Sequence, residues 1–597
     1  MPDKPDNPFK FWEELKRRKV IQVVTLYASS SFVIIEVINN LAEPLNLPTS
    51  LLTIVVIVLA IGFPLVIILS WLFDLTSKGV EKTKPLSEIE EGEKSSFSNA
   101  WKIATFVSFA VIAILVFMNL TGNLKHLKAG DIQSLVVLPF DNFTGSNESD
   151  YYVEGIHSSL ISDMGQIGAL RVKGVTTSNS FRDKDMSINQ IASELNVDAA
   201  VEGSISCFGV DSVCIQIRLI RAIGEEQLLW VQDYFVAKSQ ILNFYNEVTK
   251  TISREINIAL TPREESLLAE KRTIDPEAYD LFLRGYQHLG DGSEKLLREA
   301  QEYLIRAIEI EPDWAILYSS MAQVWMVLQQ IGHESPQVAI PKIYEYANKA
   351  LELDPNSAEA HSLIGMLAYL VEWDWPKAKI EFNEAITLNP GDALSRLFYS
   401  QILILLQETD EALKQARIAI THDPINLMVK CQFAAVLLSG YHFEEGLSVI
   451  EEVLEVLPEH TLANNQLEKA AFQIGDYERV VKAAKYHIPL KEEAFIEAEK
   501  IFKEQGFIPA YSELLRQVEV EMLNDFIIQP PTLACKFHMI GQYDKAMYWI
   551  EKGYEIHSPS LVFMVTGFYD FKHLYDNPRF IDIVNKLKLP QPKKVIE

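Results

Sequence analysis

The chain has little of the chemistry on which most enzymes and metal proteins depend. Its 597 residues include four cysteines, which is too few for a disulfide scaffold, and no two of them have the CxxC spacing of a zinc site. The sequence has no GxxxxGK[ST] phosphate loop, no HExxH pair and no GxSxG nucleophile turn. Its twelve histidines are scattered. We therefore predict a protein that is not an enzyme and has no catalytic residues, no metal and no cofactor.

Positive charge is also scarce. The formal net charge is −27, and between Asp275 and Glu597 there are 49 acidic residues against 29 basic ones. An acidic surface of this size repels phosphate backbones. We therefore expect no nucleic-acid partner for this half of the chain.

Charge is rare in several long runs near the N-terminus, and these runs explain the slightly positive mean hydropathy. The run 51–73 is uncharged over 23 residues, roughly 35 Å as a helix and long enough to cross a bilayer. The run 102–121 is a second candidate. The run 20–41 contains serines, asparagines and a glutamate, so it is either a span or an amphipathic helix at the interface.

The basic residues predict an orientation for these runs. Six lysines and arginines precede the first run, none lies in 42–50, and five lie in 74–102. Positively charged segments stay on the cytoplasmic side. The expectation is three spans, with residues 1–19 and the loop 74–101 in the cytoplasm, contact with membrane lipid, and the rest of the chain on the far side.

Residues 134–260 predict a small domain of mixed helices and strands. SLVVLPF (134–140) has the composition of a buried strand, and 151–167 has helical spacing of apolar residues. Two alternating segments around 209–212 predict a hairpin, LLWVQDYFV predicts a third adjoining strand, and 240–260 predicts a closing helix. Residues 188–195 predict a short helix with Ser187 as its N-cap. This order predicts helices packed on one small mixed sheet.

Two cysteines, Cys207 and Cys214, flank the expected hairpin turn. Directly opposed residues on antiparallel strands lie about 4.5–5.5 Å apart, which suits a disulfide. The two alternatives are a cross-strand disulfide and two small buried side chains.

A prolyl step recurs along the second half of the chain and predicts its architecture. Self-similarity at about 34 residues is typical of a helix pair repeated into a solenoid. Six or seven such pairs are expected over 275–560, followed by capping helices in 561–597, where Asn577-Pro578 is a helix-start signal. The recurring prolines, which are 43, 35, 34 and 34 residues apart, are Pro312, Pro355, Pro390, Pro424 and Pro458.

Residues inside this frame match the tetratricopeptide repeat (TPR). Gly365 lies where the first helix of a pair needs a small residue, and Ala378, Phe382 and Ala385 lie where the second helix packs on its neighbour. The second half therefore resembles a TPR array. The resemblance implies a concave face that binds protein segments.

The remaining phrases resemble a family of bacterial membrane proteins. VVLPFDNFTGSNESDYYVEGIHSSLISDM, GSIS…VCIQIRLI and LLWVQDYF are similar to a TolB-like N-terminal domain, and FWEELKRRKV and GFPLVIILSWLFDLTSKGV are similar to the segment before it. This group is related to CadC-type regulators and cyclase-associated repeat proteins. The chain lacks their winged helix and cyclase domains. The resemblance implies a multi-pass protein of the bacterial inner membrane with periplasmic α/β and TPR domains.

The positions expected to line the concave face are mixed and fairly apolar. They favour a hydrophobic or helical ligand, or burial against the α/β domain. The candidate groove residues are Glu359, Ser362, Met366, Tyr369, Leu394, Leu397, Gln401, Met428, Cys431 and Ala435.

Two functions follow from the sequence. The first is a membrane-anchored scaffold that recruits a protein partner through its TPR array. The alternative is a transmembrane sensor that relays an envelope signal to a cytoplasmic partner. An enzyme is the third class, and no constellation of residues favours it.

Overall fold

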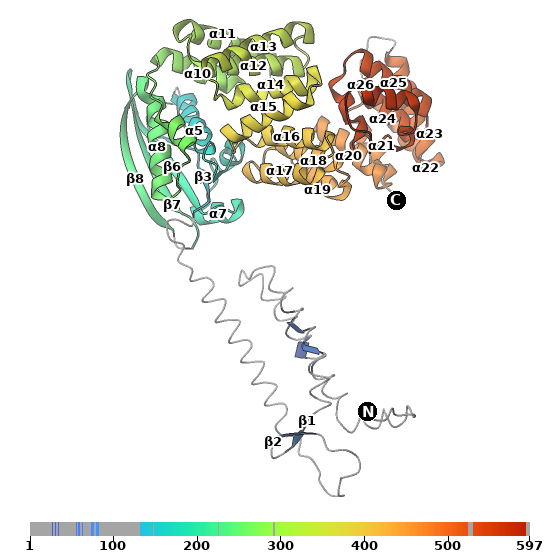
Figure 1. Ribbon diagram of the computed structural model, residues 1–597, viewed down its shortest axis with the longest axis horizontal. Helices are drawn as coiled ribbons and strands as arrows, with labels where there is room; N and C mark the ends of the chain where they lie inside the picture. Colours follow the sequence, from blue (N-terminus) through green and yellow to red (C-terminus); the bar gives the residue numbers. More distant parts are fainter. Residues whose placement is uncertain are drawn as a thin grey trace. The chain divides into compact units, whose positions relative to one another are not determined.

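The computed structural model describes residues 132–592, except 147–148, 225, 290–292 and 523–528, together with some residues between 27 and 82 (Figure 1). The chain divides into two compact units, Met1–His126 and Leu127–Glu597. In the first unit, strands β1 (Phe73–Thr76) and β2 (Gly79–Lys82) pair antiparallel.

The predicted localisation is corrected by the structure. No helix formed by the described residues has both the length and the apolar character that a bilayer crossing requires. The longest of these helices, α13 (Pro336–Leu353), has 18 residues, and lysines and glutamates recur along it. This finding contradicts the expectation of a multi-pass inner-membrane protein with periplasmic domains. The segments 20–41, 51–73 and 102–121, on which that expectation was based, lie largely outside the described residues.

The second unit begins with a sheet that has the predicted mixed topology. Its strand order is β5-β3-β6-β7-β8, and a short strand, β4, also pairs with β6. β3 is parallel to β5 and β6, whereas β6, β7 and β8 form an antiparallel meander. The strands are β3 (Ser134–Val137), β4 (Asp141–Asn142), β5 (Arg171–Val172), β6 (Ala199–Phe208), β7 (Ser212–Arg221) and β8 (Gln227–Ala237).

Helices cover both faces of this sheet. α5 (Asp150–Gly165) and α8 (Ile241–Glu255) share one core with β3, β6 and β7, and α7 (Ile188–Leu195) packs on the other face. The predicted N-cap Ser187 begins α7, since its hydroxyl accepts from the Gln190 backbone N–H in a reciprocal capping box. The short helices α6 (Val175–Asn179) and α9 (Pro262–Ala269) were not expected from the sequence.

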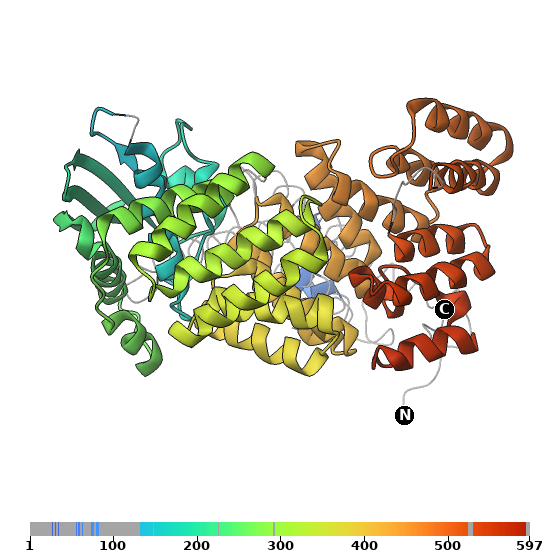
Figure 2. The ribbon, with the colours of Figure 1, turned by 90° about the horizontal axis from the view of Figure 1, so that it is seen from above.

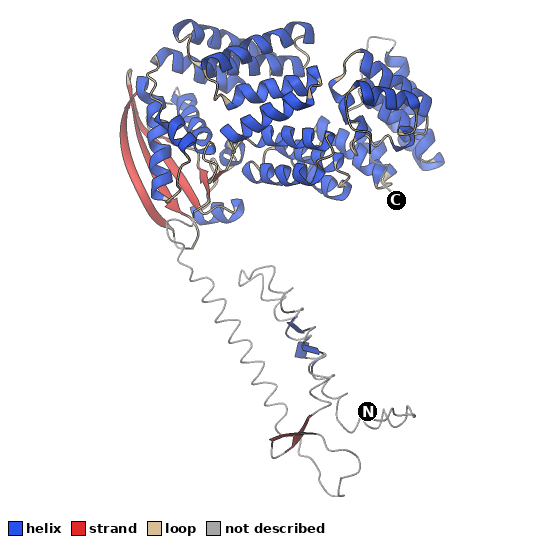
Figure 3. Cartoon of the chain, viewed as in Figure 1, coloured by secondary structure: helices blue, strands red, loops and turns tan. Residues whose placement is uncertain are grey.

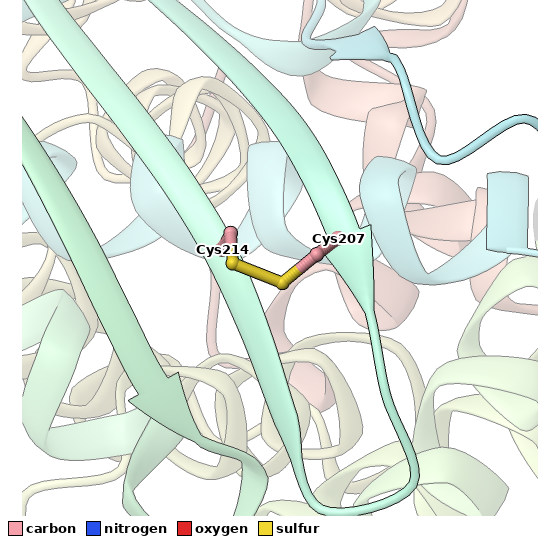
Figure 4. Close-up of a disulfide and its surroundings, with 2 residues drawn as sticks. All are labelled: Cys207 and Cys214. Carbon is pink, nitrogen blue, oxygen red and sulfur yellow. A yellow bond between two sulfur atoms is a disulfide. The ribbon is translucent and has the colours of Figure 1, made fainter.

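The predicted disulfide pair lies within this sheet. Cys207 of β6 faces Cys214 of β7, with the two Cα atoms 4.9 Å apart, and a disulfide joins them (Figure 4). The other two cysteines, Cys431 and Cys535, are free and buried.

The rest of the unit is helical, in agreement with the predicted solenoid (Figure 3). The described residues form eight consecutive helix pairs, rather than six or seven, and the pairs follow one another in chain order (Figure 2). The pairs are α10 (Pro276–Leu289) with α11 (Glu294–Ile310), α12 (Ala315–Gln330) with α13, α14 (Ala358–Leu367) with α15 (Trp375–Leu388), α16 (Ala393–Leu405) with α17 (Thr409–His422), α18 (Leu427–Ser439) with α19 (Phe443–Val456), α20 (Thr461–Gln473) with α21 (Tyr477–Ala484), α22 (Glu492–Gln505) with α23 (Phe507–Glu521), and α24 (Pro530–Met539) with α25 (Tyr543–Glu555).

A short capping segment follows the last pair. It contains the 3₁₀ turns η7 (Pro559–Val565) and η8 (Lys572–Leu574) and the helix α26 (Pro578–Lys586). As the Asn577-Pro578 signal predicts, the Asn577 side chain caps α26 by accepting from the Arg579 backbone N–H at 2.9 Å.

The recurring prolines and small residues explain the helix pairs. α11, α13, α15, α17 and α19 each end two residues before a recurring proline, which cannot continue the helix. Gly365 of α14 allows close packing, because a Cβ atom there would lie 3.2 Å from the Phe382 ring. Phe382 is fully buried beside Ala378 and Ala385.

We predict that the Phe382 ring anchors this part of the solenoid. Phe382→Ala leaves a cavity under α14 and should lower the free energy of unfolding by about 3–5 kcal/mol. Ile380, on the same helix, has 66% of its surface exposed, so Ile380→Ala should change stability by about 0.5 kcal/mol or less. Urea denaturation followed by circular dichroism measures both, and equal midpoints for the two variants would contradict the prediction.

Candidate protein-interaction surface

The predicted groove residues lie on three successive first helices, α14 with its continuation η5 (Ala368–Glu372), α16 and α18. Met428 is 46% exposed, Glu359, Ser362, Met366 and Leu394 are half-buried, and the remaining five are buried. These five are Tyr369, Leu397, Gln401, Cys431 and Ala435.

A ladder of side chains joins three of the predicted positions. The Tyr369 hydroxyl donates to Gln401 Oε1 at 3.1 Å, and Gln401 Nε2 donates to Gln432 Oε1 at 2.7 Å. Gln432 Nε2 then lies 3.8 Å from the Met428 sulfur. Gln432 was not among the predicted groove residues. Because it lies one helical turn after Met428, the repeat pattern could have identified it.

The α/β domain covers one edge of the repeats. Gly165, at the end of α5, accepts a backbone hydrogen bond from Gly391 at 3.0 Å. Neither glycine tolerates a side chain here, since a Cβ on Gly391 would lie 3.0 Å from Gly165 Cα. Further along the edge, the backbone N–H and the hydroxyl of Thr177 both donate to Asp423 Oδ1, at 2.9 and 2.7 Å. Burial against the α/β domain, one of the alternatives from the sequence, therefore accounts for part of the repeat surface.

Carboxyl groups meet where α5 approaches α14. Burial, reinforced by the neighbouring Glu359, raises the pKa of Asp163 to about 7. Burial also raises the pKa of Glu359, and the Asp392 carboxylate adds to that shift. Because each carboxylate disfavours ionisation of the others, docking of α5 is stronger when this group carries a proton.

The capping segment covers the opposite edge of the repeats. Trp373, in the turn before α15, stacks on His557 with ring centroids 3.6 Å apart. Trp375 Nε1 donates to the Leu587 carbonyl at 2.8 Å, and the Gly567 N–H donates to the Ser439 carbonyl at 3.0 Å. WDWP (373–376) spans this turn and the start of α15, and the capping segment packs against it.

Inside the array, the polar side of α20 is buried. Asn464, Gln466, Glu468 and Lys469 are each at most 4% exposed. The Lys469 ammonium lies 4.8 Å from the Phe568 ring centroid and 5.6 Å from that of Tyr569. Burial lowers the pKa of Lys469 to about 8. The capping segment thus fills the face that α20 would otherwise turn towards a ligand.

A charged network lies next to this face. Lys536 of α24 forms a buried ion pair with Glu468 at 2.5 Å and also donates to His487 Nε2 at 3.1 Å. The Tyr511 hydroxyl donates to the other oxygen of Glu468. Burial alone would raise the pKa of Glu468, but the Lys536 charge beside it holds this pKa well below its usual range. Burial lowers the pKa of His487. Since its Nδ1 lies 2.9 Å from the Ala483 carbonyl, we assign the ring proton to Nδ1.

This network is structural rather than catalytic in its geometry. The groups pair with one another, and Glu468, Lys536 and Tyr511 are each at most 1% exposed. Burial also raises the pKa of the two free thiols, to about 11 for Cys431 and about 12 for Cys535, so neither is a ready nucleophile. Within the described part of the chain, no group of three His, Cys, Asp or Glu side chains is placed to hold a metal ion.

The chain is similar to parts of several curated proteins. No family model matches it. It is 27% identical over 235 residues to "Putative adenylate cyclase 3" of Rhizobium meliloti (strain 1021), which is 39% of this chain and 40% of that protein. It is 24% identical over 294 residues to the transcriptional regulator HilA of Salmonella typhimurium, which is 49% of this chain and 51% of the regulator. The chain therefore spans about half or less of the length of these relatives.

Solved structures similar to the chain include several TPR proteins. YrrB, described as a TPR protein with an unusual peptide-binding site, is 21% identical and covers 33% of this chain and 97% of its own, with a TM-score of 0.24. Pseudomonas aeruginosa PilF is 15% identical and covers 40% of this chain and 97% of its own, with a TM-score of 0.28. Yeast Tom70 is 19% identical and covers 47% of this chain and 57% of its own, also with a TM-score of 0.28. Neither these comparisons nor the described residues support the alternative of a transmembrane sensor.

We predict that the carboxyl group at the end of α5 makes stability depend on pH. The folded pKa of Asp163 (about 7) lies above its ordinary 3.8, so the folded state keeps a proton that the unfolded state releases. Stability should therefore fall as pH rises from about 4 to 7, with a slope of at most about 1.4 kcal/mol per pH unit. Asp163→Asn should remove this slope and be more stable than the parent at pH 8.

Thermal unfolding from pH 4 to 8 measures the effect. Asp185, which is exposed on the same domain, supplies the control variant Asp185→Asn. A slope that survives in Asp163→Asn, or that disappears equally in the control, would show that another group is responsible.

We also predict that removing one partner of the buried Glu468–Lys536 ion pair lowers the free energy of unfolding. Glu468→Gln leaves the Lys536 charge buried without its counterion, which should cost about 3–5 kcal/mol. Replacing both residues by methionine should restore much of the loss, because well-packed apolar groups can substitute for a buried pair. Glu451→Gln breaks the exposed ion pair with Arg479 and should cost about 1 kcal/mol or less. Urea denaturation compares the three variants, and a single variant at position 468 as mild as the exposed control would contradict the prediction.

Proposed function

We propose that this chain is a protein-recruiting scaffold, in which the repeats bind a partner around Met428 on the inner side of α14, α16 and α18. The observation that carries the proposal is the exposure of Met428. It is 46% exposed, whereas most other apolar residues of α18 are buried. An unbranched thioether at such a position adapts readily to an apolar side chain of a partner.

The neighbouring groups supply polar recognition. The amides of Gln401 and Gln432 lie next to Met428 and are oriented by the Tyr369 hydroxyl. Leu394 and Ser362 are half-buried on the preceding helices. A short apolar patch beside fixed amides is suited to a peptide that presents one or two apolar side chains and free backbone groups, in a helical or an extended conformation.

The charge of the array indicates what the partner contributes. The half of the chain that forms the repeats has an excess of acidic residues, and two carboxyl groups, those of Glu359 and Asp392, lie on the helices that precede α18. Complementary charge favours encounter and correct register. The partner segment should therefore combine apolar residues with lysine or arginine.

The two curated relatives have different named activities. One relative is named as an adenylate cyclase and the other as a transcriptional regulator, and each match covers less than half of this chain. This difference favours an interaction role for the chain over either of the two activities.

A crosslinking experiment tests the scaffold. With a photoreactive amino acid in place of Met428, the full chain should crosslink to a discrete partner in its own cells. The same amino acid in place of Ile380, which is 66% exposed on the second helix of a pair, should not. Adding Gln432→Ala to the Met428 crosslinker should weaken capture about fivefold or more, since a hydrogen bond lost from an interface typically costs about 1 kcal/mol.

The result that would overturn the proposal is equally specific. Equal yields of the same product from positions 428 and 380, or no product from position 428 while the chain remains folded, would place partner binding elsewhere or remove it.

A further inference from the structure

A cavity lies where the α/β domain meets the repeats, away from Met428. Its volume is about 880 Å³, within the range of small-molecule sites. One wall comes from the α/β domain, around Gly168 to Arg171, and the other from α16 and one face of α17. It also borders the loop that contains Pro390.

The charge of the cavity is opposite to that of the protein. Four cationic side chains line it, Arg171, Arg396, Lys414 and Arg417, against one carboxylate, Asp410. The whole chain has a formal net charge of −27. A concave basic site in an acidic protein concentrates small anions while the surrounding surface repels extended ones.

These cations have unused hydrogen-bonding capacity. Arg396 is 8% exposed, and its terminal nitrogens donate to Gln415 and to the Pro390 carbonyl, but its buried Nε has no partner within the described residues. The Nε of Arg171 is likewise buried and unpartnered, and its guanidinium forms no ion pair in the described part of the chain. Each Nε is enclosed by protein atoms, so a ligand in the cavity would be bound through the remaining N–H groups of the terminal guanidinium nitrogens.

A histidine in the cavity wall reports the same positive potential. Burial, together with the smaller effect of the Arg396, Lys173 and Arg171 charges, lowers the pKa of His422 to about 4. His422 therefore stays neutral, and its Nδ1 lies 3.1 Å from the Val172 carbonyl of β5. Lys173 is held beside it by donating to the Thr421 carbonyl at 2.7 Å.

We propose that this cavity binds a small molecule that carries a phosphate group. Arg171 and Arg396 would hold the phosphate, because guanidinium groups match its oxygens in a fork-like geometry. Lys414, whose side chain is 66% exposed and forms an ion pair with Glu411 at 3.3 Å, would add charge at the mouth. Arg417 is already engaged by both oxygens of Glu445, at 2.5 and 2.8 Å, and would contribute through its field. Leu413 and Ile418 of α17 leave an apolar wall for the organic part of the ligand.

Such a ligand would join two domains. Arg171 belongs to β5, whereas Arg396 and Lys414 belong to the repeats. An anion between them would relieve repulsion among the cations that line the cavity and would hold the α/β domain against α17.

The test is direct binding to the full chain. Calorimetry and thermal unfolding are measured with inorganic phosphate, pyrophosphate, glucose 6-phosphate and ATP, with citrate as a carboxylate control. At least one phosphorylated probe should bind and raise the unfolding temperature, and citrate should bind more weakly. A preference for the organic phosphates over pyrophosphate would support an organic ligand, and the reverse would restrict the site to an inorganic anion and overturn that part of the proposal.

Three variants locate the site. Arg171→Gln and Lys414→Gln should each weaken binding, about tenfold or more for Arg171, which would lose a charge-assisted contact. Arg221→Gln is the matched control, because this arginine also has an unpartnered Nε but lies on β7 and does not line the cavity. Lys414→Gln changes an exposed side chain and keeps the test valid if Arg171→Gln does not fold.

Two results would overturn the proposal. One is the absence of binding by every phosphorylated probe at about millimolar concentration, the weak limit of specific recognition. The other is binding that Arg171→Gln and Lys414→Gln leave unchanged, or that Arg221→Gln weakens as much. A ligand-dependent fall in hydrogen exchange of residues 421–426 in the parent, absent in Lys414→Gln, would support the bridging of the two domains.

Discussion

A stack of helix pairs cannot bury the apolar faces at its two ends, and this constraint shapes the whole second unit. At the first end, Tyr279, Phe282 and Trp314 of the repeats join one continuous core with the sheet of the α/β domain. At the other end, the aromatic residues of the capping segment close the array, with Phe571 and Phe580 fully buried. The α/β domain is therefore a structural cap as well as a domain of its own.

The same need for burial explains the polar interior. The repeats of a binding solenoid usually leave the polar side of their first helices to a ligand. In α20 that side is covered by the chain itself, and the charge of Lys469 is compensated by aromatic rings rather than by solvent. The inner surface still open to a partner is thereby narrowed to the neighbourhood of α16 and α18, where Met428 is exposed.

Local patterns in the sequence predicted the elements well. The β6–β7 hairpin, the Ser187 cap and the Asn577-Pro578 start follow from residues close in the chain, whose geometry neighbours within a few positions decide. The recurring prolines likewise predicted the second helix of five pairs. The boundaries of repeats that lack the proline, such as α20–α21, are harder to assign from the sequence. The number of helix pairs was therefore underestimated.

Contacts between distant segments could not be predicted in the same way. The residues next to Tyr369 and Cys431 in the sequence do not indicate that distant segments of the chain cover these side chains. Five of the ten expected groove residues are therefore buried. The charged lining of the cavity was hidden for the same reason, since Arg171 and Arg396 are more than two hundred residues apart. The expectation of a multi-pass protein came from hydropathy, the distribution of basic residues and the family resemblance, and no helix of the described residues supports it.

The meeting of Gly165 with Gly391 has a consequence for how the two domains can be separated. At this point the seam between them is main chain against main chain, with the Asn389 side chain next to both glycines. A small shift of one domain along the other would break this backbone contact. The two domains therefore dock in a single register or separate. Separating the two domains would expose this backbone contact on both sides. Replacing one domain by that of a related protein would also require a glycine at the matching position.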